Sequence, residues 1–113
     1  MDLKGTVAIV TGGGTGIGRA VSLRLAKAGA RAVVVNYSSS TDEAQTTAAE
    51  LVLLGAHVLV HKADVSKEPE VKAMVAATVD RYGRLDVLIN NAGTIRRAPA
   101  VDYWKKTGRR LSK

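Results

Sequence analysis

The sequence predicts an α/β fold built on a doubly wound parallel sheet. Short runs of β-branched and other apolar residues alternate with longer segments of helical periodicity along the 113-residue chain. A glycine-rich turn, TGGGTGIG, follows the first apolar run. Strands that are almost continuously apolar are typical of a parallel sheet whose two faces are covered by crossover helices. The length fits one domain.

Four strands are expected from the apolar runs, at Thr6–Thr11, Arg31–Asn36, His57–Asp64 and Leu85–Asn91. A helical segment separates each strand from the next, and such crossovers are right-handed. The predicted strand order is therefore 3-2-1-4, with the topological switch point between the first and fourth strands. Ligands bind such sheets beyond the carboxyl ends of the strands.

Three helices are expected, at Ile17–Gly29, Thr41–Gly55 and Ser66–Gly83. Ile17, Val21 and Leu25 share one face of the first helix, and apolar residues also recur at helical spacing in the third. Thr41 and Ser66 are expected N-caps. The first two helices are predicted to cover one face of the sheet and the third the other. The fourth strand is expected to be an exposed edge.

The glycine turn is the strongest functional signal. Gly12, Gly16 and Gly18 lie between a strand and a helix, where glycine permits positive φ and close approach of the backbone. Such a turn presents backbone N–H groups and a helix N-terminus to a pyrophosphate. The alternative is a plain strand-to-helix turn.

Three separated motifs share one resemblance: T-G-x-x-x-G-x-G at Thr11–Gly18, Asp64-Val65 after the third strand, and NNAG at Asn90–Gly93. In order and spacing they resemble the N-terminal cofactor-binding half of the short-chain dehydrogenase/reductase family. The resemblance covers Lys4 to about Tyr103 and implies a partial Rossmann-like domain over residues 1–103. It also implies roles for individual residues. Gly12, Gly16, Ile17 and Gly18 would cradle the cofactor diphosphate, Asp64 and Val65 would hold the adenine, and Asn90, Ala92 and Gly93 would line the path of the riboses.

The segment after the second strand favours NADP(H) over NAD(H). NAD-binding sites of this kind usually carry an acidic residue that accepts from the ribose 2′-OH, and Asn36 stands in its place. Tyr37 and Ser38–Ser40 add neutral donors, and Arg19 is a candidate for the phosphate or an ordinary solvated helix residue. Many NADP-dependent relatives carry a basic residue where this chain has Thr15.

No catalytic residue is assigned. The family transfers a hydride between the nicotinamide and a carbonyl or alcohol carbon, using a serine and a Tyr-x-x-x-Lys pair. Tyr103 is followed four residues later by Thr107, and Lys106 stands at a different spacing. The substrate is open. Arg96 and Arg97 would suit the carboxylate of a sugar acid or are an ordinary solvated loop pair, and acyl thioesters, simple sugars and polyols are further substrate classes. Family members are commonly homo-oligomers.

The basic charge is concentrated in the last ten residues, 104–113. They contain five Lys or Arg and no acid, within a net charge of +7 for the whole chain. A nucleic-acid surface is therefore not expected. Codons can be chosen for this tail so that a shifted reading frame encodes EEDWEEVIE, which resembles the segment that family members carry here. A frameshift is therefore one hypothesis for the tail, and a short protein with a basic tail is the alternative.

Composition excludes several other classes. The chain has no cysteine, and no apolar run approaches the length of a membrane span. A cytoplasmic protein is expected, without membrane partners. His57 and His61 are interpreted as structural, because no third metal ligand accompanies them. The alternative to a catalytically incomplete oxidoreductase is a non-catalytic dinucleotide-binding or interaction module.

Overall fold

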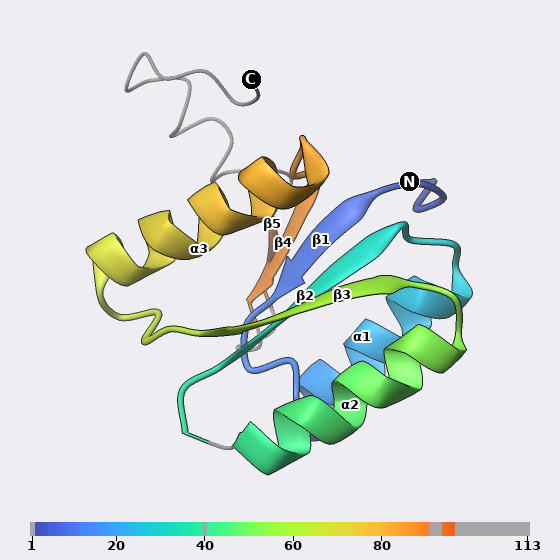
Figure 1. Cartoon of the computed structure of the whole chain (residues 1–113), viewed down its shortest axis with the longest axis horizontal. Helices are drawn as coiled ribbons and strands as arrows, with labels where there is room; N and C mark the ends of the chain where they lie inside the picture. The colour runs from blue at the N-terminus through green and yellow to red at the C-terminus, as the bar shows by residue number, and fades with distance from the viewer. Residues whose placement is uncertain (1, 40, 91–93, 97–113) are drawn as a thin grey trace.

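The computed structural model describes residues 2–39, 41–90 and 94–96 (Figure 1). Its strands are β1 (Val7–Val10), β2 (Ala32–Tyr37), β3 (His57–Lys62), β4 (Val87–Asn90) and β5 (Thr94–Arg96). Its helices are α1 (Gly16–Lys27), α2 (Thr41–Leu53) and α3 (Glu68–Tyr82). The alternation predicted from the apolar runs is confirmed, and most element ends move by one or two residues.

The strands form one sheet in the order β3-β2-β1-β4-β5. The first four strands are parallel, so the predicted order 3-2-1-4 is confirmed. Strand β5 was not predicted, and it pairs with β4 in antiparallel fashion, with Ile89 opposite Ile95. The expectation that β4 is an exposed edge is therefore wrong, because the chain folds back beside it directly after the fourth strand.

The helices lie on the two faces of the sheet as predicted. Figure 1 shows α1 and α2 on one face and α3 on the other. Val33 and Val35 of β2 point toward α1 and α2, where they pack with Leu25 and Leu51. Val34, between them in sequence, joins the opposite cluster with Met74, Val75 and Val79 of α3. This alternation explains why the strand is apolar at every position: both of its faces are buried.

Two expectations about the helices differ from the structure. Ile17 was predicted to share one apolar helical face with Val21 and Leu25, yet Ile17 is 71% exposed. Ser66 was expected to cap the third helix, but the N-cap is Lys67, without a side-chain hydrogen bond. Ser66 instead donates both its N–H and its hydroxyl to Asp64 Oδ1, at 3.0 and 2.6 Å. This local turn uses the hydroxyl that a cap would need.

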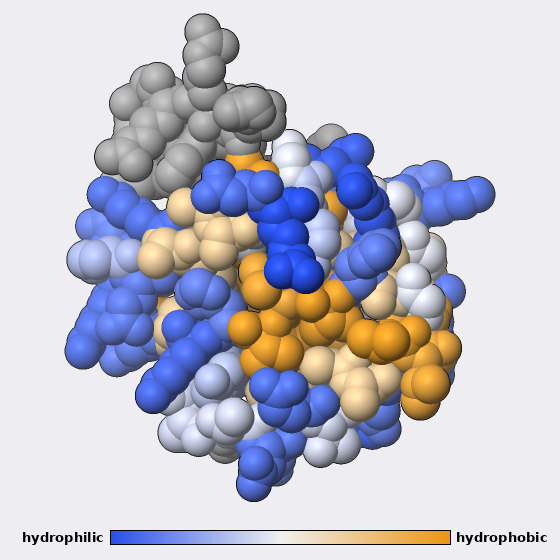
Figure 2. All heavy atoms as spheres, in the orientation of Figure 1, coloured by the Kyte–Doolittle hydropathy of each residue, from blue (hydrophilic) through white to orange (hydrophobic). Residues whose placement is uncertain are grey.

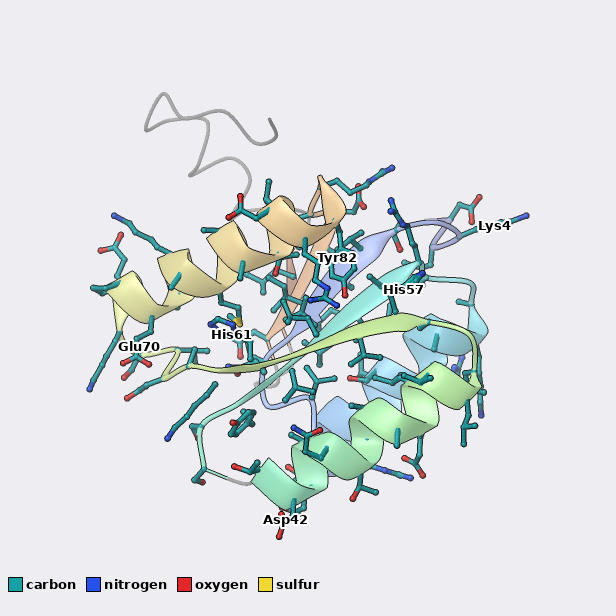
Figure 3. The ribbon with its side chains drawn as sticks, in the orientation of Figure 1. Lys4, Asp42, His57, His61, Glu70 and Tyr82 are labelled. Carbon is teal, nitrogen blue, oxygen red and sulfur yellow. The ribbon has the colours of Figure 1, made fainter. Side chains whose placement is uncertain are left out.

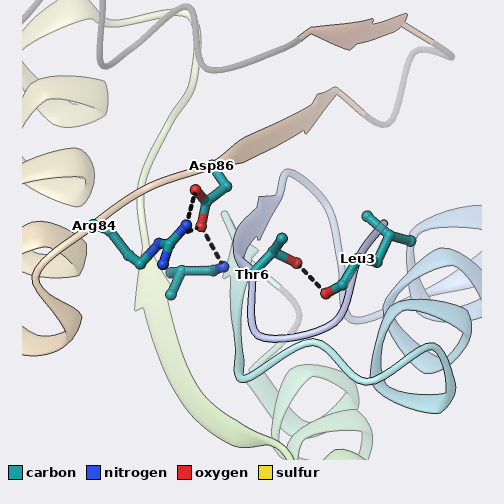
Figure 4. A network of polar contacts seen from close by, with 5 residues as sticks. Leu3, Thr6, Arg84 and Asp86 are labelled. Atoms are coloured by element: carbon teal, nitrogen blue, oxygen red, sulfur yellow. Dashed lines mark hydrogen bonds and ion pairs between the residues drawn. The ribbon is translucent and has the colours of Figure 1, made fainter. Parts of the chain in front are cut away.

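Asp86 joins the amino ends of β1 and β4 (Figure 4). Its Oδ2 accepts the Val7 N–H at 2.9 Å, and Arg84 donates to both carboxylate oxygens at 2.8 and 2.7 Å. Burial raises the pKa of Asp86, but the hydrogen bonds from Arg84 and Val7 outweigh it and leave the pKa below its ordinary value. The network lies at the opposite end of the sheet from the glycine turn.

Strand β3 forms one edge of the sheet. Its residues Val58 to His61 are half-buried. Val52 and Leu53, at the C-terminal end of α2 just before this strand, are exposed. Figure 2 shows the resulting apolar surface over β3 and the C-terminal end of α2. Within the described segments, no helix has the length and apolar character needed to cross a membrane.

Candidate functional site: the glycine turn and the carboxyl ends of the strands

The glycine turn leaves the carboxyl end of β1 and enters α1. Gly12 and Gly16 have φ of 60° and 51°, a left-handed conformation that residues with a Cβ rarely adopt. The first hydrogen bond at the start of α1 runs from Arg19 N–H to Thr15 O at 3.1 Å. The amides of Gly16, Ile17 and Gly18 precede it, so they are the donors that a helix N-terminus leaves for a ligand.

Three further glycines are required by close packing rather than by φ. A Cβ on Gly18 would lie 2.0 Å from Gly12 O, and one on Gly13 would lie 2.8 Å from Val10 O. A Cβ on Gly14 would lie 2.7 Å from Ala44 Cα of α2. At Gly16, by contrast, a Cβ would meet no atom within 4 Å. The turn is therefore packed against β1 and α2 and open at Gly16.

Helix α2 holds the turn in place through Thr47, a residue that the sequence did not single out. Its hydroxyl donates to Gly14 O at 2.9 Å, and its side chain is fully buried. The Ser22 hydroxyl of α1 donates at 2.9 Å to Gly18 O of its own helix and lies 3.4 Å from Gly13 O of the turn. Serine and threonine are common in amphipathic helices. Their presence in the sequence therefore does not predict hydrogen bonds such as these.

Asn36 is a structural tie between three segments. Its side chain is buried (3% exposed). Its Oδ1 accepts the Gly12 N–H at 3.1 Å, and its Nδ2 lies 3.1 Å from Ala63 O and 3.3 Å from His61 O. Its backbone oxygen also accepts from Gly13 N–H at 3.0 Å. The amides of Gly12 and Gly13 are thus occupied within the protein.

Two hollows adjoin at Gly14 and Thr15. One is lined by these two residues, by Gly12, by Asn36 and Tyr37 at the end of β2, and by Ser38 and Ser39 just after it. The other lies toward α2 and includes Gly16, Arg19, Asp42 and Glu43. Arg19 is paired there with Glu50, with Nη2 2.6 Å from Oε2. The cation predicted for a phosphate therefore has a carboxylate partner on α2.

Asp64 begins the turn after β3. Its N–H donates to Glu70 Oε1 at 2.7 Å, so the first turn of α3 fixes the backbone at this point. The two hydrogen bonds from Ser66, together with the nearby charge of Lys67, hold the pKa of the Asp64 carboxyl below its ordinary value. Asp64 is ionised at neutral pH, and Val65 beside it is half exposed. Figure 3 shows Glu70 at this end of the sheet.

The remaining predicted residues divide into two groups. Asn90 ends β4, beside Thr94 of β5. Six of these predicted residues lie outside the described part of the chain: Ser40, Ala92, Gly93, Arg97, Tyr103 and Lys106. His57 lies beside Tyr82 of α3, with ring centroids 6.5 Å apart (Figure 3). No group of three or more His, Cys, Asp or Glu within residues 2–39, 41–90 and 94–96 is placed to hold a metal ion.

Comparison with known proteins identifies the family to which this fold and turn belong. A family model described as short chain dehydrogenase matches residues 6–111. The chain belongs to the short-chain dehydrogenase family. The match begins one residue before β1, takes in every strand and helix described above, and extends into the basic tail.

Curated short-chain dehydrogenase relatives differ in how much of them the chain spans. It is 45% identical to the short-chain dehydrogenase/reductase homolog YusS of Bacillus subtilis over 107 residues, which are 95% of this chain and 97% of that protein. It is 44% identical over 93 residues to a hydroxynaphthalene reductase-like protein, Arp2, of Metarhizium robertsii. That match covers 82% of this chain but 34% of Arp2.

Solved short-chain dehydrogenases have the same architecture over about a third of their length. A short-chain dehydrogenase/reductase from Serratia marcescens superposes with a TM-score of 0.75 at 41% identity, covering 80% of this chain and 37% of that one. A putative dehydrogenase from Burkholderia cenocepacia with bound NADP gives a TM-score of 0.75 at 30% identity, covering 79% and 34%.

Proposed function

We propose that this chain binds a nicotinamide dinucleotide through its adenosine and diphosphate groups, as part of an NAD(P)-dependent oxidoreductase of the short-chain dehydrogenase type. The observation that carries the proposal is the glycine turn, which is open at Gly16, the first residue of α1. The first-turn amides and the helix dipole favour an anion at that point.

The described residues fit such a cofactor along its adenosine half. Gly16, Ile17 and Gly18 would donate to the diphosphate, and the hollow beside Thr15, Tyr37 and Ser38 would take the adenosine ribose. Asp64 Oδ1 is used by Ser66, so Oδ2 would accept the adenine amino group, with Val65 against the ring. Gly12 supports the cradle by its conformation, because its N–H is bonded to Asn36.

We favour NADP(H) over NAD(H) as the cofactor. The described residues that line the hollow at the end of β2 include no Asp or Glu, so none of them would repel a 2′-phosphate. The hydroxyls of Tyr37, Ser38 and Ser39 would be neutral donors toward it. The Burkholderia relative carries bound NADP, and a metagenomic short-chain oxidoreductase was solved in complex with NADP.

The proposed reaction is carbonyl reduction or alcohol oxidation, for which the bound nicotinamide supplies or accepts the hydride. We propose a sugar acid or an acyl thioester as the substrate class. No Tyr-x-x-x-Lys pair occurs in the 113 residues. We therefore propose that this chain supplies the cofactor-binding half of the activity and does not turn substrate over by itself.

Calorimetric titration of the full chain with NADP⁺ and NAD⁺ tests the binding proposal. We expect saturable 1:1 binding that competes with ADP-ribose, which contains the adenosine and diphosphate but lacks the nicotinamide. Assays with simple ketones and NADPH test the second part, and we expect no turnover. Absence of binding would overturn the proposal, and sustained turnover would overturn the claim of catalytic incompleteness.

A second candidate is a non-catalytic module that binds a dinucleotide and another protein. An apolar hollow beside α1 and β4 favours it, lined by Leu3, Val21, Val87 and Ile89, with Ile17 at its rim. Exposed apolar surface of this kind marks interaction sites in soluble proteins. Size-exclusion chromatography with multi-angle light scattering tests it: a monodisperse monomer that binds no other chain would reject this candidate.

A further inference from the structure

The charges around the proposed adenosine site are not arranged as the sequence suggests. Arg19, the cation nearest the glycine turn in sequence, is held by Glu50 at 2.6 Å. The hollow on its side of the turn also contains Asp42 and Glu43. Because Glu50 already pairs with its guanidinium, Arg19 is not available as the cation for a 2′-phosphate. A 2′-phosphate therefore needs another cation.

Lys62 stands at the other side of the same site. It is the last residue of β3, and its Cα is the register partner of Tyr37, the last residue of β2. Neighbouring strands lie about 4.8 Å apart. Tyr37 lines the hollow at the end of β2, so the Lys62 backbone lies directly beside the lining of that hollow.

The strand alternation places the two side chains on one face of the sheet. Val58 and Val60 pack against the cluster on the α1 and α2 side, whereas Leu59 packs toward α3. Lys62 follows Val60 by two residues and so points to the same side as Val60. Tyr37 packs against that same cluster. The ammonium and the proposed ribose hollow therefore share the α2 side of the sheet.

Lys62 is exposed, and the two ion pairs found among the described residues, Arg19–Glu50 and Arg84–Asp86, do not involve it. A lysine ammonium is a point charge on a flexible four-carbon stem, so it can follow an anion without a fixed geometry. Strand position and face together bring it to the ribose end of the site.

We propose that Lys62 is a specificity-determining residue, the cation that distinguishes the 2′-phosphate of NADP(H) from the 2′-hydroxyl of NAD(H), and that Arg19 does not serve this purpose. The inference rests on the proposed function, because it takes the hollow at the end of β2 as the site of the adenosine ribose.

Calorimetry of the full chain with NADP⁺ and NAD⁺ tests this assignment. Lys62→Gln is expected to weaken NADP⁺ binding by about three- to tenfold, the effect of losing one solvent-exposed ion pair to a phosphate, and to leave NAD⁺ binding unchanged. Lys62→Arg keeps the charge and should keep the ratio of the two affinities. Higher ionic strength should reduce the difference in NADP⁺ affinity between wild type and Lys62→Gln.

Two controls make the comparison specific. Lys27→Gln removes the same charge from the last turn of α1, at the other end of the sheet, and should not change the ratio. Arg19→Gln should not change it either. An unchanged ratio in Lys62→Gln, or a larger fall in Arg19→Gln, would overturn the assignment. If the wild type binds neither nucleotide, the proposed function itself fails, and this inference fails with it.

Discussion

The side-chain amide of Asn36 connects Gly12 to the carboxyl end of β3, accepting the Gly12 N–H at 3.1 Å while its nitrogen lies 3.1 Å from the Ala63 oxygen. The residue that the sequence marks as a cofactor determinant is therefore first a structural one. It fixes the start of the glycine turn relative to β2 and β3, and all its hydrogen-bonding atoms are used inside the protein.

Replacement of Asn36 by aspartate is expected to destabilise the fold at neutral pH. The carboxylate would still accept from Gly12, but its second oxygen would face the carbonyl oxygens of Ala63 and His61 in a buried position. We expect a loss of about 2–3 kcal/mol, measured by urea denaturation. Burial and these carbonyls would raise the pKa of the new carboxyl, so stability should recover as the pH falls through that pKa.

Ser38→Asp is the matched control for this variant. It adds the same charge two residues further on, where the side chain is exposed, and should change the free energy of unfolding by less than about 0.5 kcal/mol. Equal stability of Asn36→Asp and wild type at pH 7 would contradict the role assigned to the amide.

Thr47→Val is expected to destabilise the glycine turn without creating a cavity in the core. Valine preserves the shape of threonine but removes the hydroxyl that donates to Gly14 O at 2.9 Å. The buried carbonyl would lose its partner, at a cost of about 1–2 kcal/mol. The control is Thr46→Val, because the exposed Thr46 hydroxyl bonds only within its own helix, to Asp42 O. The two variants should differ in the midpoint of thermal unfolding, and similar midpoints would argue against the contact.

Alanine scanning of the turn should separate steric from conformational requirements. Gly18→Ala places a Cβ 2.0 Å from the Gly12 carbonyl oxygen, so the start of the turn and α1 must move apart. Gly16→Ala meets no atom within 4 Å and has only its φ of 51° to accommodate, which costs about 1–2 kcal/mol. We expect Gly18→Ala to be the more destabilised in urea denaturation, and the opposite order would contradict the packing described here.

The Asp86 carboxylate should make the free energy of unfolding dependent on pH in the acidic range. Its pKa is lower in the folded chain than the value near 3.9 of an unfolded aspartate. Its contribution is therefore complete above the unfolded pKa and is lost as the pH falls through the folded one. At pH 7, Asp86→Asn should cost about 1 kcal/mol, because Val7 N–H keeps an acceptor while Arg84 loses its charged partner.

The measurement for Asp86 is the free energy of unfolding between about pH 2 and pH 7, compared with Asp80→Asn on the exposed side of α3. The difference between Asp86→Asn and wild type should shrink below about pH 4. A difference that stays constant across this range would show that ionisation of Asp86 does not stabilise the fold.

Much of the fold could be predicted because its signals are local. The β-branched runs indicate strands buried on both faces, and the helical segments between them require parallel crossovers, which leaves few possible topologies. Strand β5 escaped prediction because three residues carry no periodicity. Ile17 was misplaced because the start of α1 lies beside a hollow instead of under another element.

The sequence by itself determined the parallel sheet, its order, and the position of the glycine turn at the carboxyl end of β1, because apolar periodicity and glycine spacing are properties of neighbouring residues. The tertiary structure alone decided what the polar side chains near that turn do. Asn36 binds Gly12, Arg19 binds Glu50, Thr47 binds Gly14, and Lys62 lies beside Tyr37, and each pair joins residues at least 24 positions apart. Such partners depend on how strands and helices pack, and no local pattern of residues encodes that packing.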